Sequence, residues 1–463
     1  MSQSSRLAVF DRRRAGVLLH PSSLVTPGAP PDGQPGALTW RARRFIDWLV
    51  DAGFTVWQVL PLGPTGADGS PYWARSDQAG NPLLIDRQQQ PPGGAGAFDE
   101  FRRSNGWWLE DYALYESLSR SQHSAPWWDW PQPLRDREQR ALEEARSRNA
   151  ALIAAIEHEQ WQFNQQWQEL RAYAQSRGLR LYGDLPIYVA PDSVTTWTQR
   201  SQFQLDASGR PTAVAGVPPD YFAVDGQLWG NPLYDWDRMR GDDFQFWRQR
   251  LAAQASRYDV LRIDHFRGLA AYWAVPAGAP NARDGQWRDA PGRAMLEAVA
   301  RELPDMPFIA EDLGVITPDV EALRHDFHLP GMRVLQFAFD GGSDNPHLPH
   351  NHETDCVIYT GTHDNDTTAG WYASIGERTR QRMQDYLGIW DGDAMDAMIR
   401  TTLASVAKLA VLPLQDVLRL GSEARFNLPG TVTGNWLWRV DLDLLSPELA
   451  RHHRELNELY GRS

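Results

Sequence analysis

Asp264 is the residue of this sequence whose neighbours best prepare it for chemistry. It ends a run in which apolar residues alternate with Arg262 and Asp264. If this run is a strand, its period of two places the arginine and the aspartate on one face. A guanidinium beside a carboxylate keeps that carboxylate ionised and oriented, which suits a nucleophile. For the motif alone, a structural ion pair at the end of a strand is the alternative interpretation.

Two more acidic residues, Glu311 and Asp364, end or follow other predicted strands. Three acids in one pocket repel one another, so the pKa of at least one should rise. Cleavage of a glycosidic bond needs one ionised and one protonated carboxyl group, because the ionised group attacks while the protonated one delivers a proton to the leaving oxygen. The pattern predicts Asp264 as the nucleophile. Glu311, which has apolar neighbours in the chain, is predicted to be the acid/base.

Metal binding is the rival use of such a cluster, because histidines and a further aspartate lie nearby in the sequence: His347, His350, His352, Asp355 and His363. These histidines show no helical pair accompanied by a glutamate general base. Their surroundings are rich in Asn and Pro, which is typical of a surface loop. We therefore expect no metal ion and no cofactor.

Strands and helices alternate along most of the chain, which would bring the acids together. The predicted strands are residues 15–20, 54–60, 179–185, the strand that carries Asp264, 306–314, 332–339, 356–360, and 406–416, which supply the eighth strand or the helix beside it. Eight such units with acids at the strand ends indicate an α/β fold of the (β/α)8 TIM-barrel type. A doubly wound open sheet is the alternative, but its glycine fingerprint after the first strand is missing.

Two segments interrupt the alternation. Residues 87–178 lose strand patterning and show apolar residues at helical spacing, which predicts a helical insertion after the second strand. Residues 191–243 are rich in turns and predict a loop-rich insertion over the active site after the third strand. Because the alternation resumes after each one, we expect residues 1–463 to form a single catalytic barrel.

The composition is that of an ordinary globular protein. The net charge of -13 and the absence of a basic cluster argue against a nucleic-acid partner. One cysteine and no apolar run of about 18 residues predict a cytoplasmic protein without a membrane partner. The 21 tryptophans fit sugar stacking or a core role equally well. No sequence pattern here predicts an oligomeric state.

Ten runs of this sequence resemble the 4-alpha-glucanotransferases, also called amylomaltases or disproportionating enzymes, of glycoside hydrolase family 77. The runs are residues 60–66, 70–72, 80–86, 183–190, 216–222, 227–236, 262–268, 310–314, 362–367 and 434–439. The resemblance implies a barrel without a C-terminal β domain. It also implies that Asp264 is the nucleophile, Glu311 the general acid/base and Asp364 the carboxylate that supports the transition state.

The resemblance further implies a set of substrate-binding residues. Arg262 and His363 match the residues beside the acids, and Tyr72 and Asp184 match donor-sugar contacts. The remaining matches are Ser70, Gln227, Trp229, Asp340 and Asn427.

The expected activity is transfer of a segment of an alpha-1,4-glucan to the 4-hydroxyl of another glucan or of glucose. Maltooligosaccharides are therefore the expected partners. We expect the aromatic residues Tyr221, Phe222 and Trp229 to cover the site and exclude water. An alpha-glucan hydrolase and a non-catalytic glucan-binding barrel are the alternative functions.

Overall fold

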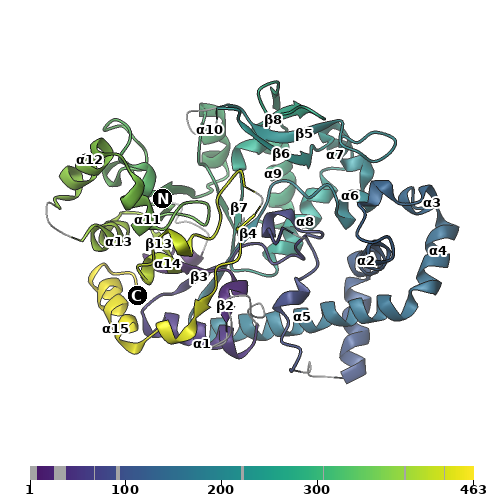
Figure 1. Ribbon diagram of the computed structural model, residues 1–463, viewed down its shortest axis with the longest axis horizontal. Helices are drawn as coiled ribbons and strands as arrows, with labels where there is room; N and C mark the ends of the chain where they lie inside the picture. The colour runs from purple at the N-terminus through teal and green to yellow at the C-terminus, as the bar shows by residue number, and fades with distance from the viewer. Residues whose placement is uncertain are drawn as a thin grey trace.

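Eight parallel strands form the centre of the computed structural model (Figure 1). The structure describes residues 8–25, 38–66, 68–89, 94–219, 224–305, 307–389, 393–431 and 433–463. The strands are β1 (Arg14–Leu18), β3 (Val56–Gln58), β4 (Arg180–Leu185), β7 (Val260–Ile263), β10 (Phe308–Ala310), β11 (Gly331–Val334), β12 (Cys356–Tyr359) and β13 (Leu409–Pro413). Their order is β10-β7-β4-β3-β1-β13-β12-β11. The predicted TIM barrel is confirmed.

The two faces of these strands bury different apolar sets, as the period of two requires. Val56, Val260 and Ile309 belong to one buried cluster inside the barrel. Trp57, Leu261 and Phe308, which are the next or preceding residues in the same strands, belong to a second cluster that includes residues of the surrounding helices. Polar side chains that share the inward face therefore point into the barrel.

Helices cover the outside of the barrel. They are α1 (Trp40–Asp51), α5 (Ala150–Ser176), α8 (Gln245–Ala255), α9 (Gly292–Glu302), α10 (Pro318–Asp326), α11 (Thr368–Ser374), α12 (Glu377–Leu387), α13 (Ala394–Ala404), α14 (Leu414–Val417) and α15 (Pro447–Leu459). The sequence of residues 40–52 predicts this first helix, because Phe45, Trp48 and Leu49 recur at helical spacing and a glycine follows. The structure confirms it: these three side chains are buried, and Gly53 follows the helix at φ +74°. The last helix, α15, packs beside α1 (Figure 1).

Between β3 and β4 the chain is helical and forms an arm at one end of the molecule (Figure 1). The arm contains α2 (Gly94–Ser121), α3 (Gln132–Arg135), α4 (Gln139–Arg148) and the start of α5. Its own core is rich in aromatic residues, among them Tyr115, Trp127 and Trp130. Farther along α5, Trp167 and Leu170 join the barrel core. The same long helix thus belongs to both the arm and the barrel wall.

The segment after β4, predicted as a loop-rich insertion at residues 191–243, also contains short helices and strands. It contains α6 (Val194–Thr198), α7 (Trp236–Gly241) and two strands, β5 (Ala213–Val217) and β6 (Gln227–Pro232). These strands form an antiparallel sheet, in the order β6-β5-β8-β9, with β8 (Ala271–Pro276) and β9 (Gln286–Asp289), which follow β7. β5 and β6 are near neighbours in the sequence, as are β8 and β9, whereas β5 pairs with β8 far along the chain, and no local pattern marks that pairing. The predicted covering residues Tyr221 and Phe222 lie outside the described residues.

Beyond β13, the strand that the described residues contain is β14 (Val440–Asp441), which pairs in parallel with β2 (Leu24–Val25). In the described part of the chain no helix is long and apolar enough to cross a membrane.

Candidate active site

Arg262 links two aspartates at the carboxyl ends of β4 and β7. Asp184 and Arg262 are cross-strand partners in the barrel ladder. Arg262 Nη1 donates to both carboxylate oxygens of Asp184, at 2.8 and 2.7 Å, and Nη2 lies 2.8 Å from Asp264 Oδ1. The predicted placement of Arg262 and Asp264 on one face is therefore confirmed. A planar guanidinium suits this double contact, because its fork of donors can serve two carboxylates at once.

Tyr72, His363 and Trp436 form an aromatic wall beside this ion pair. The Tyr72 hydroxyl donates to Asp184 Oδ2 at 2.7 Å, and its ring stacks on His363 with the centroids 5.0 Å apart. Trp436 lies 5.9 Å from the Tyr72 ring and 6.1 Å from the His363 ring. Burial lowers the pKa of His363. The wall thus presents a neutral imidazole and a protonated phenol.

Glu311 directly follows β10, and backbone N–H groups hold its carboxylate. His265 N donates to Oε2 at 2.6 Å, and Leu313 N donates to Oε1 at 3.1 Å. His265 is the residue after Asp264 and has φ +47°, a left-handed conformation that is uncommon for a residue with a side chain. Glu311 therefore touches the backbone beside Asp264 and lies at the same end of the barrel.

The two acids differ in how they are held. Burial raises the pKa of both Asp264 and Glu311, and the charge of Arg262 opposes that rise. Asp264 is half-buried and contacts the guanidinium directly, whereas Glu311 is buried. Water and the arginine favour the charge on Asp264, so a proton shared by the pair rests on Glu311.

Asp364 follows β12 and completes the group of three acids. Asn427 Nδ2 donates to its Oδ1 at 2.7 Å, and Arg425 Nη2 donates to its backbone carbonyl at 2.7 Å. His363 Nε2 lies 3.3 Å from the same Oδ1. Asp364 is thus tied to the aromatic wall and to the segment after β13.

Three further predicted residues lie around this centre. Ser70 caps the short 3-10 helix Pro71–Trp73 by accepting from Tyr72 N at 3.3 Å, so it supports the backbone of Tyr72. Trp229 on β6 packs edge-on against His265, with 4.7 Å between ring centroids. Its Nε1 donates to Gln227 Oε1 at 3.0 Å. The small antiparallel sheet therefore borders the site next to Asp264.

Asp340 is the predicted site residue that the structure leaves apart. The strand predicted at 332–339 ends at Val334, and a 3-10 helix, Leu335–Phe337, follows it. The prediction that this strand reaches residue 339 was therefore wrong, and Asp340 is exposed beyond the turn. No contact within the described part of the chain joins it to the acids.

Trp436 was not singled out as a site residue, although the run 434–439 contributed to the family resemblance. Its backbone has φ +64°, and its ring completes the wall beside Tyr72 and His363. It lies 364 positions beyond Tyr72, a separation across which sequence spacing carries no information. The match of the surrounding run was the signal that could have marked it.

The histidines considered for a metal each have other partners. His347 Nδ1 accepts from Val334 N at 3.1 Å, His350 bonds Tyr386, and His352 bonds Ser405. No group of three or more His, Cys, Asp or Glu side chains in the described residues could hold a metal ion.

Comparisons with known proteins agree on one family. The family model described as 4-alpha-glucanotransferase, glycoside hydrolase family 77, matches residues 19–93 and 86–444. The 4-alpha-glucanotransferase of Thermus thermophilus is 45% identical, and the alignment covers 97% of this chain and 99% of that protein. The enzyme of the same name from Synechocystis sp. is 42% identical, with 98% and 99% covered.

A solved structure is also similar over its whole length. The amylomaltase from Streptococcus agalactiae in complex with acarbose superposes with a TM-score of 0.92 at 31% identity, covering 98% of this chain and all of that one. The amylomaltase from Corynebacterium glutamicum, at 16% identity and a TM-score of 0.76, shares the fold. This chain belongs to the 4-alpha-glucanotransferase family, glycoside hydrolase family 77.

Proposed function

We propose that this site transfers segments of alpha-1,4-glucans by a retaining double displacement. The observation that carries the proposal is the contact between Glu311 Oε2 and His265 N, the backbone group next to Asp264. It brings a buried carboxyl group and an arginine-paired carboxylate to one end of the barrel. These are the two groups that a retaining reaction needs at one anomeric carbon.

In the first step, an Asp264 oxygen attacks the anomeric carbon while the bond to the leaving 4-oxygen breaks. Glu311 gives its proton to that oxygen, which leaves as a free hydroxyl on the departing glucan. The products are a covalent glycosyl ester on Asp264 and an ionised Glu311. The N–H groups of His265 and Leu313 stabilise the new Glu311 carboxylate.

In the second step, Glu311 takes the proton of an incoming 4-hydroxyl, whose oxygen attacks the same carbon and displaces Asp264. The α configuration returns because the carbon is inverted twice. Asp364 supports the positive charge that develops on the sugar ring in both transition states. Tyr72, Asp184 and His363 are proposed to hold the donor sugar, and Gln227, Trp229 and Asn427 to line the acceptor side.

A fluorinated maltosyl reagent that forms a long-lived ester tests the nucleophile. Mass spectrometry of the digested protein should find the label on Asp264. A label on any other residue would contradict the mechanism.

Incubation with maltotriose tests transfer against hydrolysis. We expect longer as well as shorter maltooligosaccharides, because an acceptor hydroxyl competes with water for the ester. Shorter products alone would favour an alpha-glucan hydrolase. No turnover at all, together with retained glucan binding, would favour a non-catalytic barrel.

A cytoplasmic location fits the sequence, in which Cys356 is the single cysteine and is buried in the structure. Fractionation of the producing cells should recover the activity with other cytoplasmic enzymes. Recovery outside the cell would contradict this location.

A further inference from the structure

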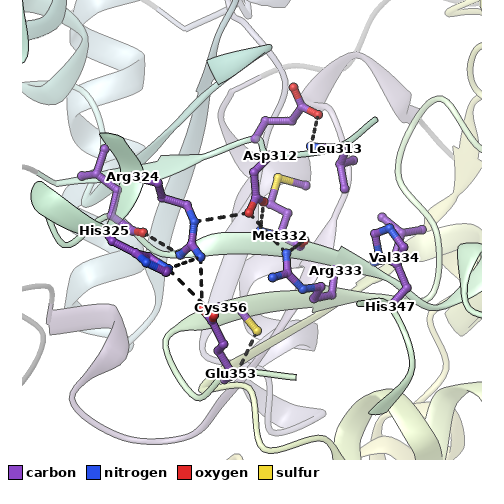
Figure 2. A network of polar contacts seen from close by, with 12 residues as sticks. Asp312, Leu313, Arg324, His325, Met332, Arg333, Val334, His347, Glu353 and Cys356 are labelled. Carbon is purple, nitrogen blue, oxygen red and sulfur yellow. Dashed lines mark hydrogen bonds and ion pairs between the residues drawn. The ribbon is translucent and has the colours of Figure 1, made fainter. Parts of the chain in front are cut away.

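The barrel closes at a seam between β10 and β11, the two ends of the strand order. A backbone hydrogen bond from Ala310 N to Pro330 O, at 2.9 Å, joins the two sides. Farther along, Met332 N donates to Asp312 Oδ1 at 2.6 Å (Figure 2). A side-chain carboxylate therefore takes the place that a backbone carbonyl holds in an ordinary ladder.

Two arginines hold the Asp312 carboxylate from other elements (Figure 2). Arg333 Nη1, from β11, donates to Oδ2 at 3.2 Å, and Arg324 Nε, from α10, forms an ion pair with Oδ2 at 3.4 Å. Arg324 also bonds Glu353 at 3.1 Å, before β12. Asp312 is 8% exposed, so its charge is stabilised by these partners and little by water.

Gly331 provides the room for this carboxylate. A Cβ atom at Gly331 would lie 2.4 Å from Asp312 Oδ2 and 2.8 Å from Oδ1. No side chain fits at that distance unless the carboxylate moves. The backbone of Gly331 is not in the left-handed region, so an alanine there would act through contact with Asp312 and not through backbone strain.

Asp312 stands between Glu311 and Leu313, whose backbone N–H donates to Glu311 Oε1. We propose that Asp312 is a positioning residue for the acid/base: by fastening the end of β10 to β11, it fixes the Leu313 N–H and the Glu311 carboxyl group at the leaving oxygen. This inference rests on the proposed role of Glu311. Asp312 itself does not touch the reacting atoms.

Two glycosyl donors, compared as substrates, distinguish a loss of Glu311 positioning from a general effect of a substitution on the fold. Maltotriose releases a sugar alcohol, whose oxygen needs a proton from Glu311, whereas α-maltosyl fluoride releases fluoride ion without one. The first turnover is measured for both, so that only formation of the Asp264 ester is observed. A variant that misplaces Glu311 loses rate with maltotriose and keeps it with the fluoride.

Asp312→Ala should lower the first-turnover rate with maltotriose by about 10²-fold, the cost of a misplaced catalytic group. With α-maltosyl fluoride the change should stay below about threefold. Gly331→Ala keeps the Asp312 carboxylate but displaces it. It should also slow maltotriose more than α-maltosyl fluoride, by a smaller factor. This second variant keeps the test decisive if Asp312→Ala fails to fold.

Asp259→Ala is the matched control. Asp259 Oδ2 accepts from Leu181 N at 2.8 Å, and Oδ1 faces Arg171 and Arg180 at 3.7 and 3.9 Å, but this group lies where β4 and β7 begin, at the opposite end of the barrel. We expect no difference between the two donors for this variant. An equal loss on both donors for Asp312→Ala and Gly331→Ala, or no loss for either, would overturn the inference.

Glu311→Gln on the same donors keeps the two proposals distinguishable. If Glu311→Gln slows the reaction of maltotriose but not that of α-maltosyl fluoride, and the Asp312 and Gly331 variants show no such difference, only the positioning role fails. If Glu311→Gln slows both substrates equally or neither of them, the acid role proposed for Glu311 fails.

Discussion

The ends of β7 and β10 carry the two central acids, and they hold them by different means. Asp264, after β7, contacts a full positive charge on Arg262 at 2.8 Å and is half-buried. Glu311, after β10, is 8% exposed and accepts two backbone N–H groups. The Arg262 guanidinium favours a permanently ionised Asp264. Backbone N–H groups at a buried position instead allow Glu311 to lose and regain a proton.

The comparison teaches that the different roles proposed for the two acids come from their surroundings and not from the side chains, which are both carboxyl groups. It also predicts which variants should respond to the leaving group. Changes on the β7 side should slow both maltotriose and α-maltosyl fluoride. Changes on the β10 side should slow maltotriose alone.

Asp264→Asn should have the largest effect, because it removes the attacking oxygen and no other group can form the ester. We expect the rate of transfer to fall by about 10⁴-fold or more. The loss should be equal for the two donors, measured in the first turnover. A rate within about tenfold of the parent enzyme would break the assignment of Asp264 to the nucleophile.

Glu311→Gln should lower the rate with maltotriose by about 10²- to 10⁴-fold, the usual contribution of a general acid. The first turnover with α-maltosyl fluoride should be nearly unchanged. Because burial raises the pKa of Glu311, the parent kcat/KM should fall only at a pH well above the ordinary range of a glutamate. This alkaline limb should be absent from the variant, and its persistence would assign the limb to another group.

Arg262→Lys should have an intermediate effect, about 10²-fold at neutral pH. Burial raises the pKa of Asp264 and Arg262 lowers it. A single ammonium cannot span both Asp184 and Asp264, so the pKa of Asp264 should rise further and less of it should be ionised. The acid limb of kcat/KM should move to higher pH, with equal losses for both donors. An unmoved limb would show that the guanidinium does not set the charge of Asp264.

Tyr72→Phe should have the smallest effect. It removes the 2.7 Å hydrogen bond to Asp184 and keeps the ring that stacks on His363. A hydrogen bond to a charged group is worth about 1.5–3 kcal/mol. Because Asp184 keeps both contacts with Arg262, we expect the lower end of that range, a loss of about tenfold in kcat/KM. Tyr72→Ala, which also removes the stacking ring, should lose more. Equal losses in the two variants would mean that the ring contributes nothing.

Local pattern was enough to predict much of the fold. The alternation around Arg262 and Asp264 placed both side chains on one face because a strand has a period of two. The apolar spacing of residues 40–52 and the glycine after them marked α1 because a helix buries one stripe and ends in a left-handed turn. Eight such units in series predicted a closed barrel and so a common mouth for the acids. These features depend on neighbours in the chain.

The tertiary structure alone decided which distant groups meet. Asp184 pairs with Arg262 across the ladder, Trp436 packs on Tyr72, and Asp312 replaces a carbonyl at the seam. The antiparallel sheet after β4 was missed for the same reason, since β5 finds its partner β8 far along the chain. A side chain's partner across the barrel depends on the register of the strands and on how the barrel closes, and local periodicity predicts neither of these. The sequence therefore determined the kinds of groups at the mouth, and folding determined how each one is held.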